Sequence, residues 1–431
     1  MEAPRKDYLI LGAGIAGLGA AQAVRQHGDR AVILERDATY GGLCGNFTIQ
    51  GFRFDRFVHF SFTGNERVNA LFRAASPEII AHEPEAWNLY RGKWIRHPAQ
   101  NNLFPLDEWE KERIIADFLC RREPGRTNPD NYEDWLRLQY GDYFAEHFPM
   151  AYTRKYWMHE ARELETKWVG ERLYRPSVEE VIRGSRTTDT PNTYYAKEMR
   201  YPRKGGYKAF LRTLAEGQDI RYGETVTGID PVAREVRTAA GNSYPYDRLV
   251  SSLPLPEVVR MLPRVPEPVR AAADRLQATC GYQVSVGLKT LRIPPYLWWY
   301  IYDEENLAAR VYSPSLKSPD NAPAGCSSLQ MEVYCKPDAY SEEELKDRTV
   351  GHLIRLGILH KADILFVDVR FERYANVVFA PDIYASRATV RDYLSKLGIA
   401  TVGRFGTWDY LWSDQSLLSG LDFMKHEEPV R

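Results

Sequence analysis

The sequence predicts an α/β fold in which a Rossmann-type dinucleotide-binding domain is interrupted by an inserted helical domain and by a domain built on an antiparallel sheet. Three observations predict it. A strand, a glycine-rich turn and a helix open the chain, residues 105–200 show mostly helical spacing, and residues 280–335 alternate as antiparallel strands do. The 431 residues are enough for two or three packed units.

The opening segment has the full pattern of a βαβ dinucleotide-binding unit. An apolar strand at 7–11 enters the hexapeptide Gly-Ala-Gly-Ile-Ala-Gly at 12–17, a helix follows at 18–26, and a second apolar strand at 31–34 ends at Glu35. Three glycines at this spacing arise by chance in roughly one chain in seven of this length. The flanking strands, helix and acid make chance a poor explanation, so we expect a bound dinucleotide.

Each residue of this motif has its own task. Gly12 allows the tight turn, Gly14 lets the backbone approach a pyrophosphate, and Gly17 lets helix and strand pack closely. The pyrophosphate would lie at the helix N-terminus, where free N–H groups favour an anion. Glu35 is placed to accept hydrogen bonds from a ribose diol.

A second pair of glycines indicates which dinucleotide binds. Gly41-Gly42 follows Glu35 and returns the chain toward the pyrophosphate, a pair that NAD-binding domains do not require. It resembles the second glycine motif of the FAD-binding family that contains monoamine oxidases, protoporphyrinogen oxidase and UDP-galactopyranose mutase. The resemblance implies FAD as the cofactor, and an ordinary Gly-Gly turn is the alternative interpretation.

Composition excludes several classes of protein. Apolar residues make up 44% of the chain, and 57 basic against 58 acidic residues leave a net charge of −1. This balance gives no electrostatic footprint for nucleic acid or an acidic membrane surface. The apolar runs are far too short to span a membrane, and we expect neither a membrane span nor a signal peptide. The five scattered cysteines lack metal or thioredoxin spacing, which favours reduced thiols in a cytoplasmic protein without a metal site.

We expect the FAD-binding domain to be discontinuous, because chains of this class leave it and return. A helix after Gly206, strand-like segments at 220–229 and 249–253, and a last strand before Arg404 mark the returns. The expected division is 1–64 with 202–262 and 365–431 for the FAD-binding domain, 105–200 for the helical substrate domain, and 65–104 with 263–364 for the antiparallel sheet domain. Residues 313–325, with three prolines, have the composition of a loop, and we expect a mobile flap there.

Further blocks along nearly the whole chain resemble UDP-galactopyranose mutase. They are residues 51–55 with His59, 92–103, 152–157, Arg172, the proline-glycine-glycine-tyrosine segment 202–207, and 402–404 with Trp408, Tyr410, Asp414 and Gln415. The family carries an acidic residue where this chain has Trp412, and its second diphosphate-binding tyrosine has no clear match around residues 374–381. The fold is therefore better supported than any particular sugar nucleotide.

The resemblance implies a role for each matching residue. The catalytic set is His59, Arg172, Arg310, Arg404 and Tyr410. The cofactor-binding set is Gly12, Gly14, Gly17, Glu35, Gly41, Gly42, Arg404, Asp414 and Gln415. The substrate-binding set is Tyr156, Trp157, Tyr195 and Trp412. Arginines and tyrosines would hold a departing diphosphate, and aromatic rings would line the base and the sugar.

Each of these residues also has a purely structural interpretation. An arginine is by default a solvated surface charge, and a histidine in the aromatic run 57–62 is usually a packed, hydrogen-bonded group. Tyr156 and Trp157 could form the core face of a helix, and Asp414 could be the N-cap of the last helix.

Three functions follow, in order of preference. The first is an FAD-dependent mutase that interconverts the pyranose and furanose rings of a nucleotide sugar, with reduced flavin as the nucleophile. NADPH or NADH is then the expected reductant, a nucleoside-diphosphate sugar the small-molecule partner, and a homo-oligomer the expected assembly. The alternative is an FAD-dependent oxidase or desaturase of the amine oxidase or protoporphyrinogen oxidase type. A non-enzymatic flavin-binding protein is least favoured.

Overall fold

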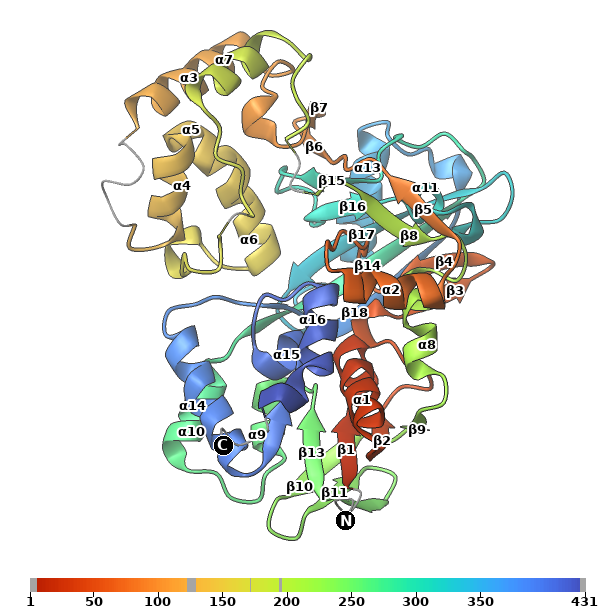
Figure 1. Ribbon diagram of the computed structural model, residues 1–431. Coiled ribbons are helices and arrows are strands. Elements are labelled where there is room, and N and C mark those ends of the chain that lie inside the picture. Colours follow the sequence, from red (N-terminus) through yellow and green to blue (C-terminus); the bar gives the residue numbers. More distant parts are fainter. Residues whose placement is uncertain (1–5, 122–128, 171, 194–195, 427–431) are drawn as a thin grey trace.

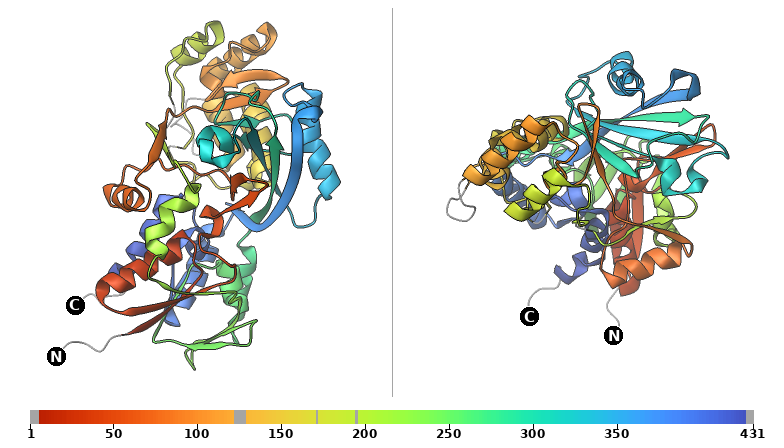
Figure 2. Two further views of the ribbon diagram at one scale, coloured as in Figure 1. Left: turned by 90° about the vertical axis from the view of Figure 1, so that its right-hand side faces the viewer. Right: turned by 90° about the horizontal axis from the view of Figure 1, so that it is seen from above.

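A computed structural model describes residues 6–121, 129–170, 172–193 and 196–426 (Figure 1). It confirms the predicted α/β fold class, with a Rossmann-type parallel sheet, a helical segment and a mainly antiparallel sheet. The described ends of the chain both lie at the parallel-sheet end of the molecule (Figure 2). Among the described residues, no helix combines the length and apolar character that crossing a membrane requires.

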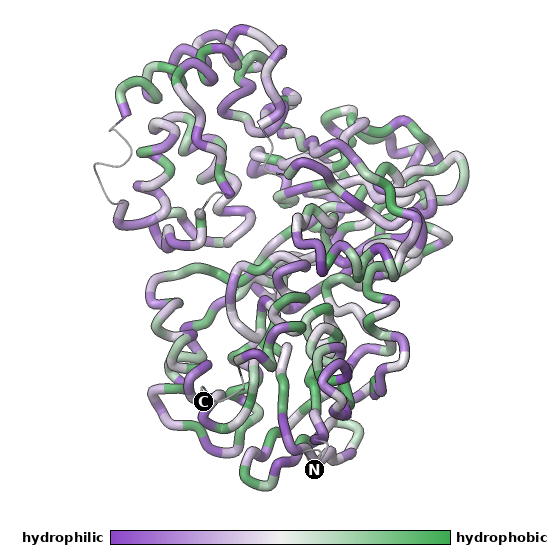
Figure 3. Tube along the Cα trace, in the orientation of Figure 1, coloured by the Kyte–Doolittle hydropathy of each residue, from purple (hydrophilic) through white to green (hydrophobic). Residues whose placement is uncertain are grey.

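The parallel sheet joins three distant parts of the sequence. Its order is β19-β13-β1-β2-β9, with β1 Asp7–Leu11, β2 Arg30–Glu35, β9 Asp219–Tyr222, β13 Arg248–Ser251 and β19 Ile399–Thr401. Four of the five residues of β1 are buried, and β1 and β13 lie in a hydrophobic part of the chain trace (Figure 3). This burial on both faces explains why these strands read as continuous apolar runs.

One helix packs against the strands of this sheet and is joined to a C-terminal helix through glycine contacts. α1 Ile15–His27 packs against α16 Ser413–Leu421. A Cβ on Gly19 would lie 2.7 Å from Leu417 O, and a Cβ on Gly420 would lie 2.1 Å from Ala16 O. The two helices can approach this closely only because glycine stands at both positions. The contact fixes the C-terminal segment beside the glycine motif.

The second large sheet has seven strands in the order β18-β14-β17-β16-β15-β6-β7. Their bounds are β6 Trp87–Tyr90, β7 Lys93–Arg96, β14 Ala278–Leu288, β15 Trp298–Ile301, β16 Arg310–Tyr312, β17 Ser327–Cys335 and β18 Ile364–Val377. All neighbours pair antiparallel except β15 and β6. β18 begins at Ile364, next to the domain boundary that the sequence analysis placed between residues 364 and 365.

The helical segment stands beside β6 and β7 at the top of Figure 1. It comprises α3 Glu108–Cys120, α4 Tyr132–Tyr140, α5 Asp142–Ala145, the π-helical turn η3 Glu146–Met150, α6 Ala151–Trp157 and α7 Val178–Arg186. Helices were expected at 106–119 and 132–148, and the second of these is three successive helical pieces. α6 contacts β17, which brings its aromatic residues to the large sheet.

Smaller elements complete the structure. The strands are β3 Asn46–Ile49, β4 Phe52–Asp55, β5 Ile79–His82, β8 Met199–Pro202, β10 Val226–Asp230, β11 Glu235–Thr238 and β12 Ser243–Pro245. The helices are α2 Glu66–Ala75, α8 Arg212–Ala215, α9 Leu255–Arg260, α10 Glu267–Arg275, α11 Pro314–Lys317, α12 Glu342–Lys346, α13 His352–Arg355, α14 Ile383–Lys396 and α15 Gly403–Thr407.

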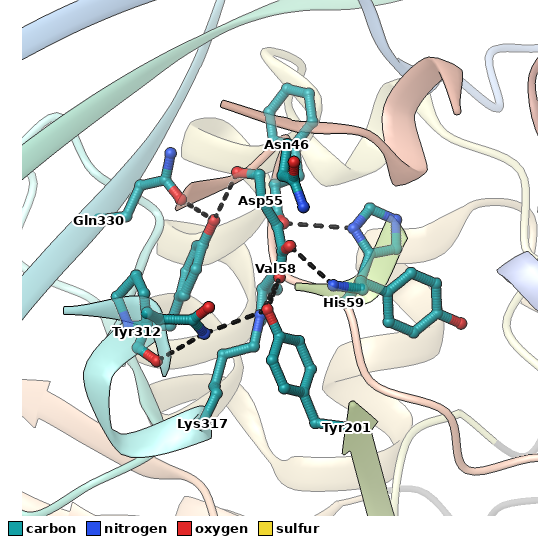
Figure 4. A network of polar contacts seen from close by, with 12 residues as sticks. Asn46, Asp55, Val58, His59, Tyr201, Tyr312, Lys317 and Gln330 are labelled. Atoms are coloured by element: carbon teal, nitrogen blue, oxygen red, sulfur yellow. Dashed lines mark hydrogen bonds and ion pairs between the residues drawn. The ribbon is translucent and has the colours of Figure 1, made fainter. Parts of the chain in front are cut away.

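The expectation of a mobile flap at 313–325 is wrong. The segment forms α11 and a 3₁₀ turn at Pro319–Asn321, and Lys317 is completely buried. Its Nζ bonds Asp55 Oδ2 at 2.5 Å, and the same oxygen accepts from Tyr201 OH at 2.7 Å (Figure 4). Proline-rich composition suggested a loop, but the partner that fixes Lys317 is 262 residues away in the sequence.

Candidate active site

A cavity of about 700 Å³ lies at the carboxyl ends of β1, β2 and β13 and extends to the helical segment. Its wall includes Gly12 and Glu35 at one end and Trp157 and Arg172 at the other. Ligand pockets in proteins usually have volumes of about 300–1,000 Å³, and open α/β sheets bind ligands at this edge. The cavity is therefore the candidate site for both a cofactor and a substrate.

The glycine turns form a cradle at the N-terminus of α1. Gly14 and Gly41 pair as an isolated parallel bridge. A Cβ on Gly42 would lie 3.2 Å from the Cα of Gly14, and one on Gly12, whose φ is +95°, would lie 2.5 Å from Ser252 Oγ. Side chains here would close the space that a pyrophosphate needs, so this part of the chain fits a dinucleotide.

Glu35 ends β2 in the cavity wall and is 7% exposed. Its Oε2 accepts from Ala13 N at 2.8 Å, and its Oε1 accepts from Asp37 N at 2.9 Å. Each carboxylate oxygen keeps a second lone pair, so a ribose diol can still donate to it. Glu35 thus also ties the glycine turn to the end of β2, a task that the sequence alone did not indicate.

Arg404 lies in α15, directly after β19. Its Nε is buried without a hydrogen-bond partner among the residues that the structure describes. Gly403 before it has φ +78°, and a Cβ there would lie 2.6 Å from Ala16 Cβ. Buried donors are normally paired, so Arg404 is arranged to donate to a group held in the cavity.

His59 lies in the cavity wall just after β4, with its ring centre 5.0 Å from that of Tyr207. Its Nδ1 is 3.2 Å from Phe57 O, which can only accept, so Nδ1 carries the proton and Nε2 is an acceptor. Burial, together with the charge of Lys317, lowers the pKa of His59 to about 4, although Asp55 opposes the shift. The imidazole is therefore neutral at pH 7.

Arg310 is held by a buried acid. Its Nε bonds Glu332, and its Nη2 donates to Tyr334 OH at 3.0 Å. Glu332 is completely buried and also accepts from Val58 N at 2.6 Å and from Tyr334 OH at 2.6 Å. Burial by itself lowers the pKa of Arg310, but Glu332 and the neighbouring tyrosines raise it well above its ordinary value. Arg310 is a charged, fixed donor whose charge Glu332 balances.

Arg172 and Arg404 each place a guanidinium at the ring of Tyr410. Arg172 Nη1 donates to Trp168 O at 2.9 Å and its Nη2 to Tyr410 O at 3.0 Å. Its guanidinium carbon lies 4.8 Å from the centre of the Tyr410 ring and 5.6 Å from that of Trp412. Like Arg404, it has a buried Nε without a partner among the described residues.

Tyr156 and Trp157 end α6 at the same place. Tyr156 OH donates to Asn376 Oδ1 at 3.2 Å and lies 3.3 Å from Tyr410 OH. Burial, and next the neighbouring Tyr410, raise the pKa of Tyr156 well above its ordinary value. The ring centres of Trp157 and Tyr410 are 5.6 Å apart, and both α6 residues are buried. They line the cavity and also belong to the hydrophobic core, and their binding of a substrate stays a prediction.

The structure brings most of the expected residues to one cavity. Its wall includes Gly12, Gly14, Glu35, Gly41, Gly42, His59, Tyr156, Trp157, Arg172, Arg310, Arg404, Tyr410 and Trp412. Gly17 lies behind the turn, where a Cβ would be 1.9 Å from Gly12 O. Tyr195 lies outside the described residues.

Asp414 and Gln415 are not in the cavity wall, and Asp414 is not the N-cap. α16 already begins at Ser413, because Trp412 is the N-cap and Gln415 Oε1 accepts from Trp412 N at 2.9 Å. Ser413 and Ser416, one position to either side of this pair, line the cavity instead.

Sequence reasoning missed several residues of the site. Glu332 and Tyr334 hold Arg310, Asn376 bonds Tyr156, and Tyr152 and Tyr300 add to the aromatic wall. A charged residue in the mostly apolar run at 329–334 was an available signal for Glu332. The described residues contain no group of three or more histidine, cysteine or acidic side chains arranged to hold a metal.

Residues 15–394 match the model of a protein family described as flavin containing amine oxidoreductase. This match covers far more than half of the sequence. The chain belongs to that family. The family implies FAD, and the glycine cradle, Glu35 and the unpaired Nε of Arg404 fit this cofactor.

Curated proteins resemble short stretches of the chain. An inactive all-trans-retinol 13,14-reductase of Danio rerio is 38% identical over 69 residues, and the human all-trans-retinol 13,14-reductase is 35% identical over 60. These matches span 16% and 14% of this chain and only 11% and 10% of those proteins.

Solved structures extend the likeness to the whole chain. Reduced UDP-galactopyranose mutase matches with a TM-score of 0.91 and 23% identity, over 98% of this chain and 95% of that one. A putative protoporphyrinogen oxidase from Exiguobacterium sp. 255-15 matches with a TM-score of 0.75 and 18% identity, over 98% and 99%. These likenesses show a shared fold, and the family shows a flavoenzyme.

Proposed function

We propose that this flavoenzyme is a redox-neutral mutase that interconverts the pyranose and furanose rings of a nucleotide sugar. The observation that carries the proposal is the pair of arginines at Tyr410. Within the described part of the chain, neither Arg172 nor Arg404 forms an ion pair with a carboxylate, although both line the cavity. A diphosphate would supply the missing negative charge and the hydrogen-bond acceptors.

Bound and reduced, with NADPH or NADH as the source of electrons, FAD supplies the nucleophile for such a reaction. The side chains would bind and orient. Arg310, fixed by Glu332, would add a third donor to the diphosphate, and Trp157 would line the base. Neutral His59 would accept a hydrogen bond through Nε2 near the flavin.

The proposal keeps the domain division given in the sequence analysis, in which residues 1–64, 202–262 and 365–431 bind FAD.

Trp412 would be the residue that makes the site prefer a sugar or base other than that of a galactose nucleotide. The ring centres of Trp412 and Phe62 are 5.4 Å apart, and the guanidinium of Arg172 lies near the Trp412 ring. An apolar ring therefore lines the cavity where proteins of the mutase type have an acid.

An FAD-dependent oxidase or desaturase is the second candidate, and the family itself favours it. The aromatic wall of Tyr152, Tyr156, Tyr300 and Trp157 would suit an apolar ring as well as a sugar. A cationic amine would be repelled by Arg172 and Arg404, which have no acidic partner among the described residues. Lys317 is paired with Asp55 and is not in the cavity wall, so it does not act there as a flavin-side lysine.

One experiment separates the two candidates. Purified holoenzyme is incubated with a panel of nucleotide sugars, once in air and once after anaerobic reduction by dithionite, and products are separated by chromatography. The mutase predicts isomerised sugar nucleotide only with reduced flavin and no hydrogen peroxide. Arg172→Ala should abolish most of this turnover, whereas Arg175→Ala, which contacts the ring of Trp135 outside the cavity, should retain it.

The same experiment can also reject the mutase. Consumption of oxygen with formation of hydrogen peroxide, and no ring isomer from any reduced sample, would reject the mutase in favour of the oxidase.

A further inference from the structure

β18 leaves one side of its backbone open. It is the outermost strand of the seven-stranded sheet, and at 14 residues the longest strand that the structure describes. Its ladder partner is β14, and no backbone hydrogen bond joins its other edge to any described residue. Its pairing with β14 is regular over residues 366–372, between two register shifts, and this stretch presents a row of unpaired N–H and C=O groups to another strand.

The two faces of β18 are already occupied near its middle. Val367 and Val369 pack against the core cluster that includes Leu345 and Leu353 of the segment α12–α13, while Arg370 covers the ring of Phe47 on the other face. Other side chains of the strand stay partly open to solvent. Leu365 and Phe371 are 44% and 45% exposed, although both are large and apolar.

The sequence of this strand is complementary to itself when two copies run antiparallel. If Val369 faces Val369 of a second copy, Asp368 faces Arg370 and Val367 faces Phe371, each twice by symmetry. Asp368 and Arg370 share one face of the strand, where they already form an ion pair at 2.9 Å with side chains 30% and 43% exposed. In the pair of strands each charge would therefore have an opposite charge across from it.

We propose that β18 is a dimer interface at which two copies of this chain join their seven-stranded sheets through antiparallel β18–β18 pairing around Val369. A second copy fits this edge because the charges alternate in the order that antiparallel self-pairing needs. Two copies of a strand with like charges at positions 368 and 370 would instead repel each other. The paired edge buries the exposed ring of Phe371 against Val367 and satisfies the open backbone groups.

Charge reversal tests the pairing and its register. Asp368→Arg puts arginine opposite arginine, and Arg370→Asp puts aspartate opposite aspartate, so each variant should have a dimer dissociation constant about tenfold or more above that of the natural chain. An equimolar mixture of the two variants restores opposite charges across the interface. We expect dimers in the natural protein and in the mixture, but not in either variant alone.

The measurement is light scattering or sedimentation on FAD-loaded full-length protein from about 1 to about 200 µM, over which range weak dimers dissociate. Flavin absorbance and thermal melting show whether each variant remains folded. Arg292→Asp is the control, because its side chain is 82% exposed and lies outside β18.

Three results would overturn the proposal. The natural chain remains a monomer over the whole range, or both reversed variants dimerise as well as it does, or the mixture stays monomeric while both variants are folded. If a variant loses its flavin or its melting transition, Asp368→Asn with Arg370→Gln gives the same test with neutral side chains. A dimer that this double variant leaves unchanged would place the interface elsewhere.

Discussion

Arg172 and Arg404 meet at one aromatic ring, since the guanidinium carbon of each lies 4.8 Å from the centre of Tyr410. Two like charges this close repel, and the π-electrons of the ring and the carbonyl acceptors of Arg172 offset only part of that repulsion. An anion in the cavity would lower the energy of the whole arrangement. The predictions below begin from this relationship.

Arg172→Ala should weaken the binding of a nucleoside diphosphate such as UDP about ten- to a hundredfold, because a charged hydrogen bond contributes roughly 1.5–3 kcal/mol. FAD content should stay unchanged. Titration calorimetry with UDP and with free galactose measures this. Binding of UDP should also weaken at high salt, and equal affinity for both ligands in the natural protein would contradict the prediction.

Glu35→Ala should lower the fraction of protein that carries FAD. The variant loses the acceptor for ribose, at roughly 1.5–3 kcal/mol for a charged group, and also releases Ala13 N in the glycine turn. The ratio of flavin to protein absorbance after purification and dialysis reports the effect. Asp189→Ala, at a side chain 94% exposed, is the matched loss of an acid and should not change the ratio.

Arg310→Met should destabilise the fold by about 3–5 kcal/mol, because it leaves Glu332 buried without its cation. The double variant Arg310→Met with Glu332→Gln should recover a large part of this loss. The glutamine still offers an oxygen to Val58 N and carries no charge. Urea unfolding followed by circular dichroism measures both. A double variant no more stable than the single one would show that the charge of Glu332 is not the cause.

Lys317→Met should act in the same way at the second buried ion pair, Lys317–Asp55. It leaves Asp55 with the hydroxyl of Tyr201 and the amide of Tyr207 but without its ammonium, at a cost of about 3–5 kcal/mol. Adding Asp55→Asn should return part of the stability. Lys204→Met is the control, because Lys204 is exposed and forms no ion pair with a described residue. The melting temperature of this variant should match that of the natural protein.

His59 predicts a dependence of stability on pH. Its pKa is about 4 in the folded chain and about 6.5 when unfolded, so between these values the unfolded state binds a proton that the folded state does not. Stability should therefore fall as the pH is lowered from 7.5 to 5, and His59 would contribute about 2 kcal/mol of that fall. In His59→Asn the decrease in the free energy of unfolding, measured by urea titration at each pH, should be smaller by this amount. The buried His97, whose pKa is also about 4, adds a similar slope to both proteins.

Local sequence was sufficient for the parts of the site that lie on one short segment. The glycine motif, Gly41-Gly42 and Glu35 all fall within the first 42 residues, and the fold of a βαβ unit places them together. The apolar runs of β1 and β13 predicted a buried parallel sheet for the same reason. Trp412 and Asp414 show the limit of such predictions, because a helix start can shift by two residues when a side chain caps from within the helix.

By itself the sequence determined the fold class, the dinucleotide cradle and which arginines and aromatic residues were candidates for a site. Only the tertiary structure decided which of them meet, because Arg172 and Tyr410 are 238 residues apart and Arg310 needs the buried acid of the next strand. It also decided that Lys317 forms a buried ion pair with Asp55 and that β18 lies at the open edge of its sheet. Hydrophobic periodicity and turn residues act over a few positions, whereas charge pairing and sheet order depend on which distant segments the packed core brings side by side.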